Sequence, residues 1–167
     1  MSILFALGIG LGAFAAKKFD GTTLYRGKSK QDAAKNLLEL ARKQAGKGSW
    51  ERIAVGRIYY LGGMKAEGQA IFDEVTSKKP EGTDWWRIGR VYWEAGEWDK
   101  AREAFDKSLA KNPNDDKGLA ELGAYYLIKG DREKAEELFD KSMTIEPGEM
   151  WNTSAMAAGY LGVKPQE

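Results

Sequence analysis

Hydrophobic residues recur every three to four positions along most of the chain, and they are interrupted by glycine and proline rather than by strand-like alternation. From about residue 49 onward this pattern predicts seven helices. The turns between them are expected near Gly63, Pro80, Gly96, Pro113, Gly130 and Pro147. Upstream, residues 29–48 predict an amphipathic helix with Ala34, Leu37, Leu38 and Ala41 on one side. The sequence therefore predicts an all-α protein.

Three segments of the chain resemble one another and reveal a period. Gly56–Pro80, Gly89–Pro113 and Gly123–Pro147 each place glycine and proline 24 residues apart, and their starts are offset by 33 and then 34 residues. Each segment can hold two antiparallel helices, and the second helix ends before the proline because proline lacks an N–H and clashes with the preceding turn. One such unit cannot bury its apolar face alone, so neighbouring units are expected to stack.

The repeated segments resemble the tetratricopeptide repeat (TPR), whose signature runs W-x2-L-G-x2-Y, then A-x3-F, then P. The second copy matches it at Trp85, Ile88, Gly89, Tyr92, Gly96, Ala101, Phe105 and Pro113. The third copy matches it at Leu119, Leu122, Gly123, Tyr126, Gly130, Ala135, Phe139 and Pro147. The first is looser, since Gly68 takes the place of the alanine. The resemblance covers residues 49–149 and implies an α-solenoid of three helix-turn-helix units.

The pattern and the resemblance together predict a division of the chain. A hydrophobic segment, expected to be helical, spans residues 1–19. A basic linker and the amphipathic helix, which could be part of a degenerate repeat, span residues 20–48. The three TPR units are expected at 49–81, 82–115 and 116–149. Residues 150–167 are expected to form a C-terminal capping helix and tail, because MWNTSAMAAGYLG continues the first-helix pattern.

The stretch WWRIGRVYW, residues 85–93, contains more aromatic residues than the signature needs. Trp86, Arg90 and Trp93 fall within about 60° of one another on a helix, on a side that the signature residues do not use. In TPR proteins this side lines a concave groove that binds peptides of partners, and exposed aromatics beside arginines are typical of interface anchors. The resemblance therefore implies a partner-binding face made of Trp50, Ile53, Arg57, Tyr60, Trp86, Arg87, Arg90, Trp93 and Leu127.

Two further interpretations concern this face. Its three arginines, Arg57, Arg87 and Arg90, favour a partner with a carboxylate or an acidic segment. The alternative to a binding groove is that the chain covers the face itself, because most aromatic stripes at helical spacing belong to a core.

The first nineteen residues are uncharged until Lys17. Ile3–Ala16 would form about 21 Å of helix, which is short against about 30 Å of hydrocarbon, although the lysines that follow can reach the interface. A stripe of small residues suited to helix packing in lipid recurs at Gly8, Gly12 and Ala16. These features favour a membrane anchor, with the repeats on the cytoplasmic side because basic residues follow it. The alternatives are a cleaved signal peptide, giving an exported periplasmic protein, and a buried helix of a soluble domain.

Composition limits the chemistry further. The chain has no cysteine and no histidine, which excludes disulfides, thiolate and imidazole catalysis and the usual zinc sites. The net charge of +1 does not favour a nucleic-acid partner, although residues 1–50 carry +6 and the remainder −5. Carboxylates such as Glu94, Glu97 and Asp99 do not by themselves indicate an enzyme, because such residues are typical of solvated helix ends.

These observations predict a non-enzymatic protein–protein interaction adaptor, or an accessory subunit of a membrane-associated complex, with no cofactor and no metal. Its partner is expected to be a protein or peptide bound in the concave groove. The alternative is an exported soluble repeat protein that binds peptides or envelope partners.

Overall fold

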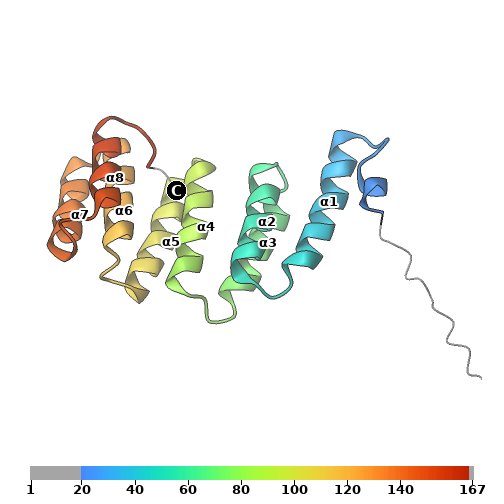
Figure 1. Cartoon of the computed structure of the whole chain (residues 1–167), viewed down its shortest axis with the longest axis horizontal. Coiled ribbons are helices and arrows are strands. Elements are labelled where there is room, and N and C mark those ends of the chain that lie inside the picture. The colour runs from blue at the N-terminus through green and yellow to red at the C-terminus, as the bar shows by residue number, and fades with distance from the viewer. Residues whose placement is uncertain (1–19, 166–167) are drawn as a thin grey trace, which may run out of the picture. The chain divides into compact units, whose positions relative to one another are not determined.

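The computed structural model describes residues 20–165. Over this range the chain forms eight α-helices and one 3-10 helix and no strand, which confirms the predicted all-α class. The elements are η1 (Gly21–Leu24), α1 (Lys30–Ala45), α2 (Ser49–Leu61), α3 (Lys65–Thr76), α4 (Gly82–Glu94), α5 (Trp98–Lys111), α6 (Asp116–Ile128), α7 (Arg132–Ile145) and α8 (Met150–Tyr160) (Figure 1). The hydrophobic helix predicted within residues 1–19 lies outside the described part of the chain. Among the helices that are described, none is long and apolar enough to cross a bilayer.

Contacts divide the chain into two units, residues 1–39 and 40–167. In the described part of the first unit, the Asp20 carboxylate accepts a hydrogen bond from the Thr22 N–H at 3.0 Å and so caps η1. Helix α1 begins after Ser29, whose hydroxyl oxygen accepts the N–H of Asp32 at 3.1 Å. The amphipathic helix predicted between residues 29 and 48 is therefore present.

The second unit contains three helix pairs and a final helix. Helix α2 packs against α3, α4 against α5, and α6 against α7, while α8 packs against α6 (Figure 1). Within each pair a glycine in the left-handed region makes the turn, with φ of 91° at Gly63, 76° at Gly96 and 89° at Gly130. The seven helices predicted from residue 49 onward, as three helix-turn-helix units and a capping helix, are confirmed.

The close approach of the two helices in a pair depends on one glycine and one phenylalanine. A Cβ placed on Gly89 would lie 2.7 Å from the ring of Phe105, which leaves no room for a larger side chain. The same relationship holds between Gly56 and Phe72, at 2.6 Å, and between Gly123 and Phe139, at 2.5 Å. The 33- and 34-residue offsets in the sequence therefore repeat one packing contact.

The first helix pair, α2 and α3, departs from the repeat pattern because its two helices pack more closely. Gly68 stands where the other units have alanine, and a Cβ at this position would lie 2.7 Å from the backbone nitrogen of Tyr60. Helices α2 and α3 approach each other so closely here that the backbones nearly touch. A glycine replaces the alanine because even a methyl group would not fit without a backbone shift.

Polar contacts also recur with the period of the repeat. The Ser108 hydroxyl donates to the Gly82 carbonyl at 2.7 Å, and the Ser142 hydroxyl donates to the Asp116 carbonyl at 2.8 Å. Both serines are buried, and each satisfies a carbonyl at the start of the preceding first helix. These bonds tie the end of one helix to the beginning of its partner.

The phenylalanines at the signature position of the second and third copies lie in the core. Phe105 is 0% and Phe139 is 6% exposed. Phe105 stacks on Tyr125 of the next repeat with 5.5 Å between ring centroids. The core therefore runs from one repeat into the next rather than stopping at each helix pair.

Candidate partner-binding groove

Trp86 does not project into an open groove. The side chain is 8% exposed, and its ring lies 4.6 Å from that of Phe105, between centroids. Its indole Nε1 donates a hydrogen bond to Oε2 of Glu121 on α6 at 3.2 Å. The expectation that Trp86 faces a partner is therefore wrong at this position, because Phe105 of the same repeat packs against its ring and Glu121 of the next repeat accepts its N–H.

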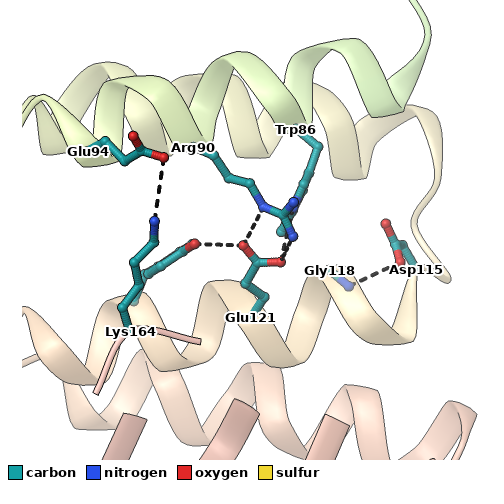
Figure 2. A network of polar contacts seen from close by, with 8 residues as sticks. Trp86, Arg90, Glu94, Asp115, Gly118, Glu121 and Lys164 are labelled. Atoms are coloured by element: carbon teal, nitrogen blue, oxygen red, sulfur yellow. Dashed lines mark hydrogen bonds and ion pairs between the residues drawn. The ribbon is translucent and has the colours of Figure 1, made fainter. Parts of the chain in front are cut away.

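Glu121 is the centre of this contact between repeats. Its carboxylate is buried and accepts hydrogen bonds from Arg90 Nε at 2.8 Å and Nη2 at 2.6 Å, and from the Tyr125 hydroxyl at 2.6 Å. Figure 2 shows Trp86 and Arg90 reaching from α4 to Glu121 on α6. A buried carboxylate is tolerated here because a guanidinium compensates its charge and further donors satisfy its oxygens.

Trp93 packs between repeats as well. It is partly buried, with ring centroids 4.5 Å from Tyr125 and 5.5 Å from Trp98. The ammonium of Lys129 lies 5.1 Å from its ring centroid. The interpretation that the chain covers this side of α4 therefore describes Trp93 and Trp86 better than an open groove does.

The aromatic bulk of α4 has a structural explanation in the uneven spacing of the first helices. Helix α6 lies much closer to α8 than to α4. A Cβ on Gly159 would lie 2.8 Å from Cα of Ala124, so α6 and α8 are nearly in backbone contact. Between α4 and α6 the space is filled instead by Trp86, Trp93 and the Glu121 network. Large side chains act as spacers on one side of α6, and small residues allow close packing on the other.

A small cleft of about 120 Å³ remains open between α2 and α4. Trp50 stands at its edge with half of its surface exposed, and the Arg87 guanidinium lies 3.9 Å from the centroid of its indole ring. Arg57 on α2 contacts the carboxylate of Glu94 on α4. This cleft therefore presents an exposed indole and paired charges to solvent.

A larger cleft of about 510 Å³ lies between α4, α6 and α8. Arg90 and Glu121 form one side, and Trp151, 53% exposed, lies on the α8 side. The segment after α8 also lines it, through Val163, Lys164 and Pro165. Both clefts include Arg90, so they form one continuous face across the first helices, which is called the groove below.

The nine predicted binding residues divide into three groups. Ile53, Tyr60 and Trp86 are buried and belong to the core. Trp93, Leu127, Arg87 and Arg90 are partly buried, and Trp50 and Arg57 are exposed. Only part of the predicted set therefore lies on the open surface of the groove.

The three arginines do not support the predicted acidic partner, because each of them contacts another residue of the chain. Arg57 contacts Glu94, Arg90 is paired with Glu121, and Arg87 lies on the indole of Trp50. Two of the three guanidinium charges that were assigned to a partner are therefore compensated within the chain. Helical spacing does not reveal Glu94 and Glu121 as the counterions, because they lie 37 and 31 positions after Arg57 and Arg90, respectively.

Two elements of the groove were missed altogether, Trp151 on α8 and the segment at Val163–Pro165. A signal for Glu121 does exist in the sequence, since it is the one charged residue in GLAELGAYYLI, residues 118–128. An isolated charge on an otherwise apolar helix requires a buried partner. For Trp151 and the segment at 163–165 the sequence offers no comparable signal.

A second polar cluster lies at the turn between α4 and α5. Glu97 accepts hydrogen bonds from the Tyr60 hydroxyl at 2.6 Å, Lys65 at 2.6 Å and Lys100 at 2.8 Å. Burial alone would raise the pKa of Glu97, but the bonds from Lys100, Lys65 and Tyr60 outweigh it and lower the pKa to about 2. The hydrogen bond to Glu97, followed by the one to Tyr60, raises the pKa of Lys100. The cluster holds the first two repeats together and keeps Glu97 charged.

The titratable side chains within residues 20–165 offer little for a metal. No group of three or more acidic residues in this range is placed to hold an ion. The carboxylates considered as alternatives for catalysis, Glu94 and Glu97, are engaged by basic residues instead.

Comparison with known proteins agrees with the repeats described above. Family models for the tetratricopeptide repeat match residues 83–115 and 117–149, which cover α4 to α7 except for the first residue of α4 and of α6. No curated protein matches the chain. Repeats of this family generally act as protein–protein interaction modules rather than enzymes, so the partners they indicate are proteins or peptides.

Two solved structures share the fold. Both are crystal structures of MamA, each 19% identical to this chain over 79% of its length, with TM-scores of 0.55 and 0.54. The matches cover 77% and 72% of those chains. At this identity the likeness concerns the fold alone. The matched repeats and the paired helices lead to one conclusion: residues 83–149 of this chain are tetratricopeptide repeats.

Proposed function

We propose that this protein is an adaptor that binds a segment of a partner protein along the groove. The observation that carries the proposal is the pair of half-exposed indoles on this one face, Trp50 at 50% and Trp151 at 53%. Tryptophan is the residue most enriched among binding anchors, because it offers a large apolar surface together with one hydrogen-bond donor. A face turned only to water would not need to expose either ring.

The surroundings of Trp50 support an anchor at this position. Arg87 lies against the ring and restricts it, so little conformational freedom is lost when a partner covers it. Nearby, Arg57 and Glu94 offer a cation and an anion to polar groups of the bound segment. The groove thus combines a fixed apolar ring with charges of both signs.

The proposal is tested by photo-cross-linking in the native cell. A cross-linking amino acid at position 54, which lines the cleft beside Trp50, should capture a defined partner. Trp50→Ala and Trp151→Ala should each reduce capture at least tenfold while the melting temperature changes little, because both rings are half exposed. Met143→Ala, a similarly exposed apolar residue on α7, is the control that should leave capture unchanged. Undiminished capture by both tryptophan variants would overturn the proposal.

We propose further that residues 1–19 attach the repeats to a membrane as part of a membrane-associated complex, with the repeats on the cytoplasmic side. The support is the uncharged run before Lys17, its small-residue stripe and the basic residues that follow. Cell fractionation tests this: the chain should sediment with membranes, and deletion of residues 2–16 should release it. N-terminal sequencing of the recovered protein separates the anchor from a cleaved export signal.

A further inference from the structure

The segment after α8 returns to the groove. Gly162 adopts a φ of 69°, and the N–H of Val163 donates to the Ala158 carbonyl at 2.8 Å, which ends the helix and turns the chain back. Lys164 then places its ammonium 3.5 Å from a carboxylate oxygen of Glu94, 70 residues earlier in the chain. Figure 2 shows this approach beside the Arg90–Glu121 pair.

The segment after α8 is held by Pro165 as well as by the ion pair of Lys164. Pro165 is buried, in contrast to the exposed positions 160–164 before it, and it lines the 510 Å³ cleft with Arg90 and Glu121. Proline suits this position because it has no N–H that burial would leave without an acceptor. It also favours an extended backbone for Lys164, which allows that side chain to reach across to Glu94.

We propose that residues 163–165 occupy the position of the partner's segment, and that the partner presents a basic residue followed by proline. The inference rests on the proposed function and names the chemistry that the groove recognises. The basic residue replaces Lys164 at Glu94, and the proline replaces Pro165 in the cleft. The inferred partner is therefore basic rather than acidic. This agrees with the contacts that Arg57, Arg87 and Arg90 already make within the chain.

The contacts of the internal segment are suited to displacement. Its ion pair with Glu94 is partly solvated, with 41% of the Lys164 side chain exposed, and pairs of this kind contribute little to stability. As part of the same chain, however, the segment competes at an effective concentration on the order of millimolar. A partner must therefore bring contacts beyond the Lys–Pro pair, and Trp50 and Trp151 are placed to supply them.

The test uses a fluorescein-labelled peptide with the sequence LGVKPQE, residues 161–167, titrated against full-length chains. Lys164→Glu combined with Pro165→Ser should remove the internal competitor, so the peptide should bind this double variant at least tenfold more tightly than the unmodified chain. Adding Glu94→Gln to the double variant should abolish the gain. Lys111→Glu, an exposed lysine on α5, is the matched charge-reversal control and should give no gain.

Equal affinity for the unmodified chain and the double variant would overturn the proposal, as would a gain that survives Glu94→Gln. A peptide with glutamate and serine in place of lysine and proline should not bind, and its binding would count equally against the inference. Failure of this inference can be distinguished from failure of the proposed function. If no peptide binds but Trp50→Ala still loses its cross-linked partner, the groove is a binding site with a different preference. If the peptide behaves as expected but both tryptophan variants keep their partner, the adaptor's site lies elsewhere.

Discussion

Arg90 and Glu121 meet through two hydrogen bonds, of 2.8 and 2.6 Å, that join the first helix of one repeat to the first helix of the next. The geometry uses the planar fork of the guanidinium, which a lysine could not reproduce. Because Trp86, also on α4, donates to the same carboxylate, these contacts fix the spacing and register of α4 against α6, while Tyr125 on α6 holds the carboxylate in place. The groove surface is built on this contact.

Loss of one partner from this pair should be costly. Glu121→Ala would leave the guanidinium of Arg90 and the donors of Trp86 and Tyr125 without their acceptor, so the free energy of unfolding should fall by about 3–5 kcal/mol. Chemical denaturation measures the change, and Glu133→Ala, an exposed glutamate on α7, is the control. A loss below about 1 kcal/mol would show that the contact does not join the repeats.

A double-mutant cycle separates the pair from its surroundings. Arg90→Met and Glu121→Gln should each destabilise the chain, and the double variant should lose less than the sum, with a coupling of about 1–3 kcal/mol. The coupling arises because each residue satisfies the buried charge of the other. Strict additivity would contradict this explanation.

The two tryptophans Trp86 and Trp50 should separate stability from binding. Trp86→Ala removes a buried ring and should lower the free energy of unfolding by about 3–5 kcal/mol. Trp50→Ala removes a half-exposed ring and should change stability by less than about 1 kcal/mol while it weakens partner binding by at least about 2 kcal/mol. Thermal melts and partner capture on the same two variants decide the matter, and the reverse pattern would contradict the assignment.

The repeated glycine–phenylalanine contact predicts that substitutions at either of its two residues lower stability. Phe105→Ala should cost about 3–5 kcal/mol, because it empties the space between α4, α5 and the next repeat. Gly89→Ala should also destabilise, by about 1–3 kcal/mol, since its methyl group would overlap the same ring. Combining the two should recover part of the loss, because the smaller side chain makes room for the methyl group.

Acid should weaken the joint between the first two repeats through Glu97. Its folded pKa of about 2 lies below its ordinary value of 4.5, so its contribution to stability is complete above pH 4.5 and is lost as the pH falls toward 2. Unfolding free energies measured from pH 6 to pH 2.5 should fall more steeply for the unmodified chain than for Glu97→Gln. Identical slopes would show that the cluster of Tyr60, Lys65 and Lys100 does not favour the ionised carboxylate.

The sequence by itself determined the repeat architecture. Glycine, phenylalanine and proline recur at offsets of 33 and 34 residues because each copy repeats the same local contact, Gly89 against Phe105 and its equivalents. Such contacts join residues within one helix pair. A period in the sequence is therefore sufficient to predict the helices, their turns and the buried phenylalanines.

What the first helices present to a partner was decided only by the tertiary structure. Helical spacing places Trp86, Arg90 and Trp93 on one side, but it does not show how far away the next repeat lies. Residues of the next repeat cover that side: Glu121 accepts hydrogen bonds from Trp86 and Arg90, and Tyr125 packs on Trp93. Lys164 reaches Glu94 across 70 residues of sequence. Periodicity records contacts that recur in every repeat, whereas these contacts occur once, so no pattern along the chain reveals them.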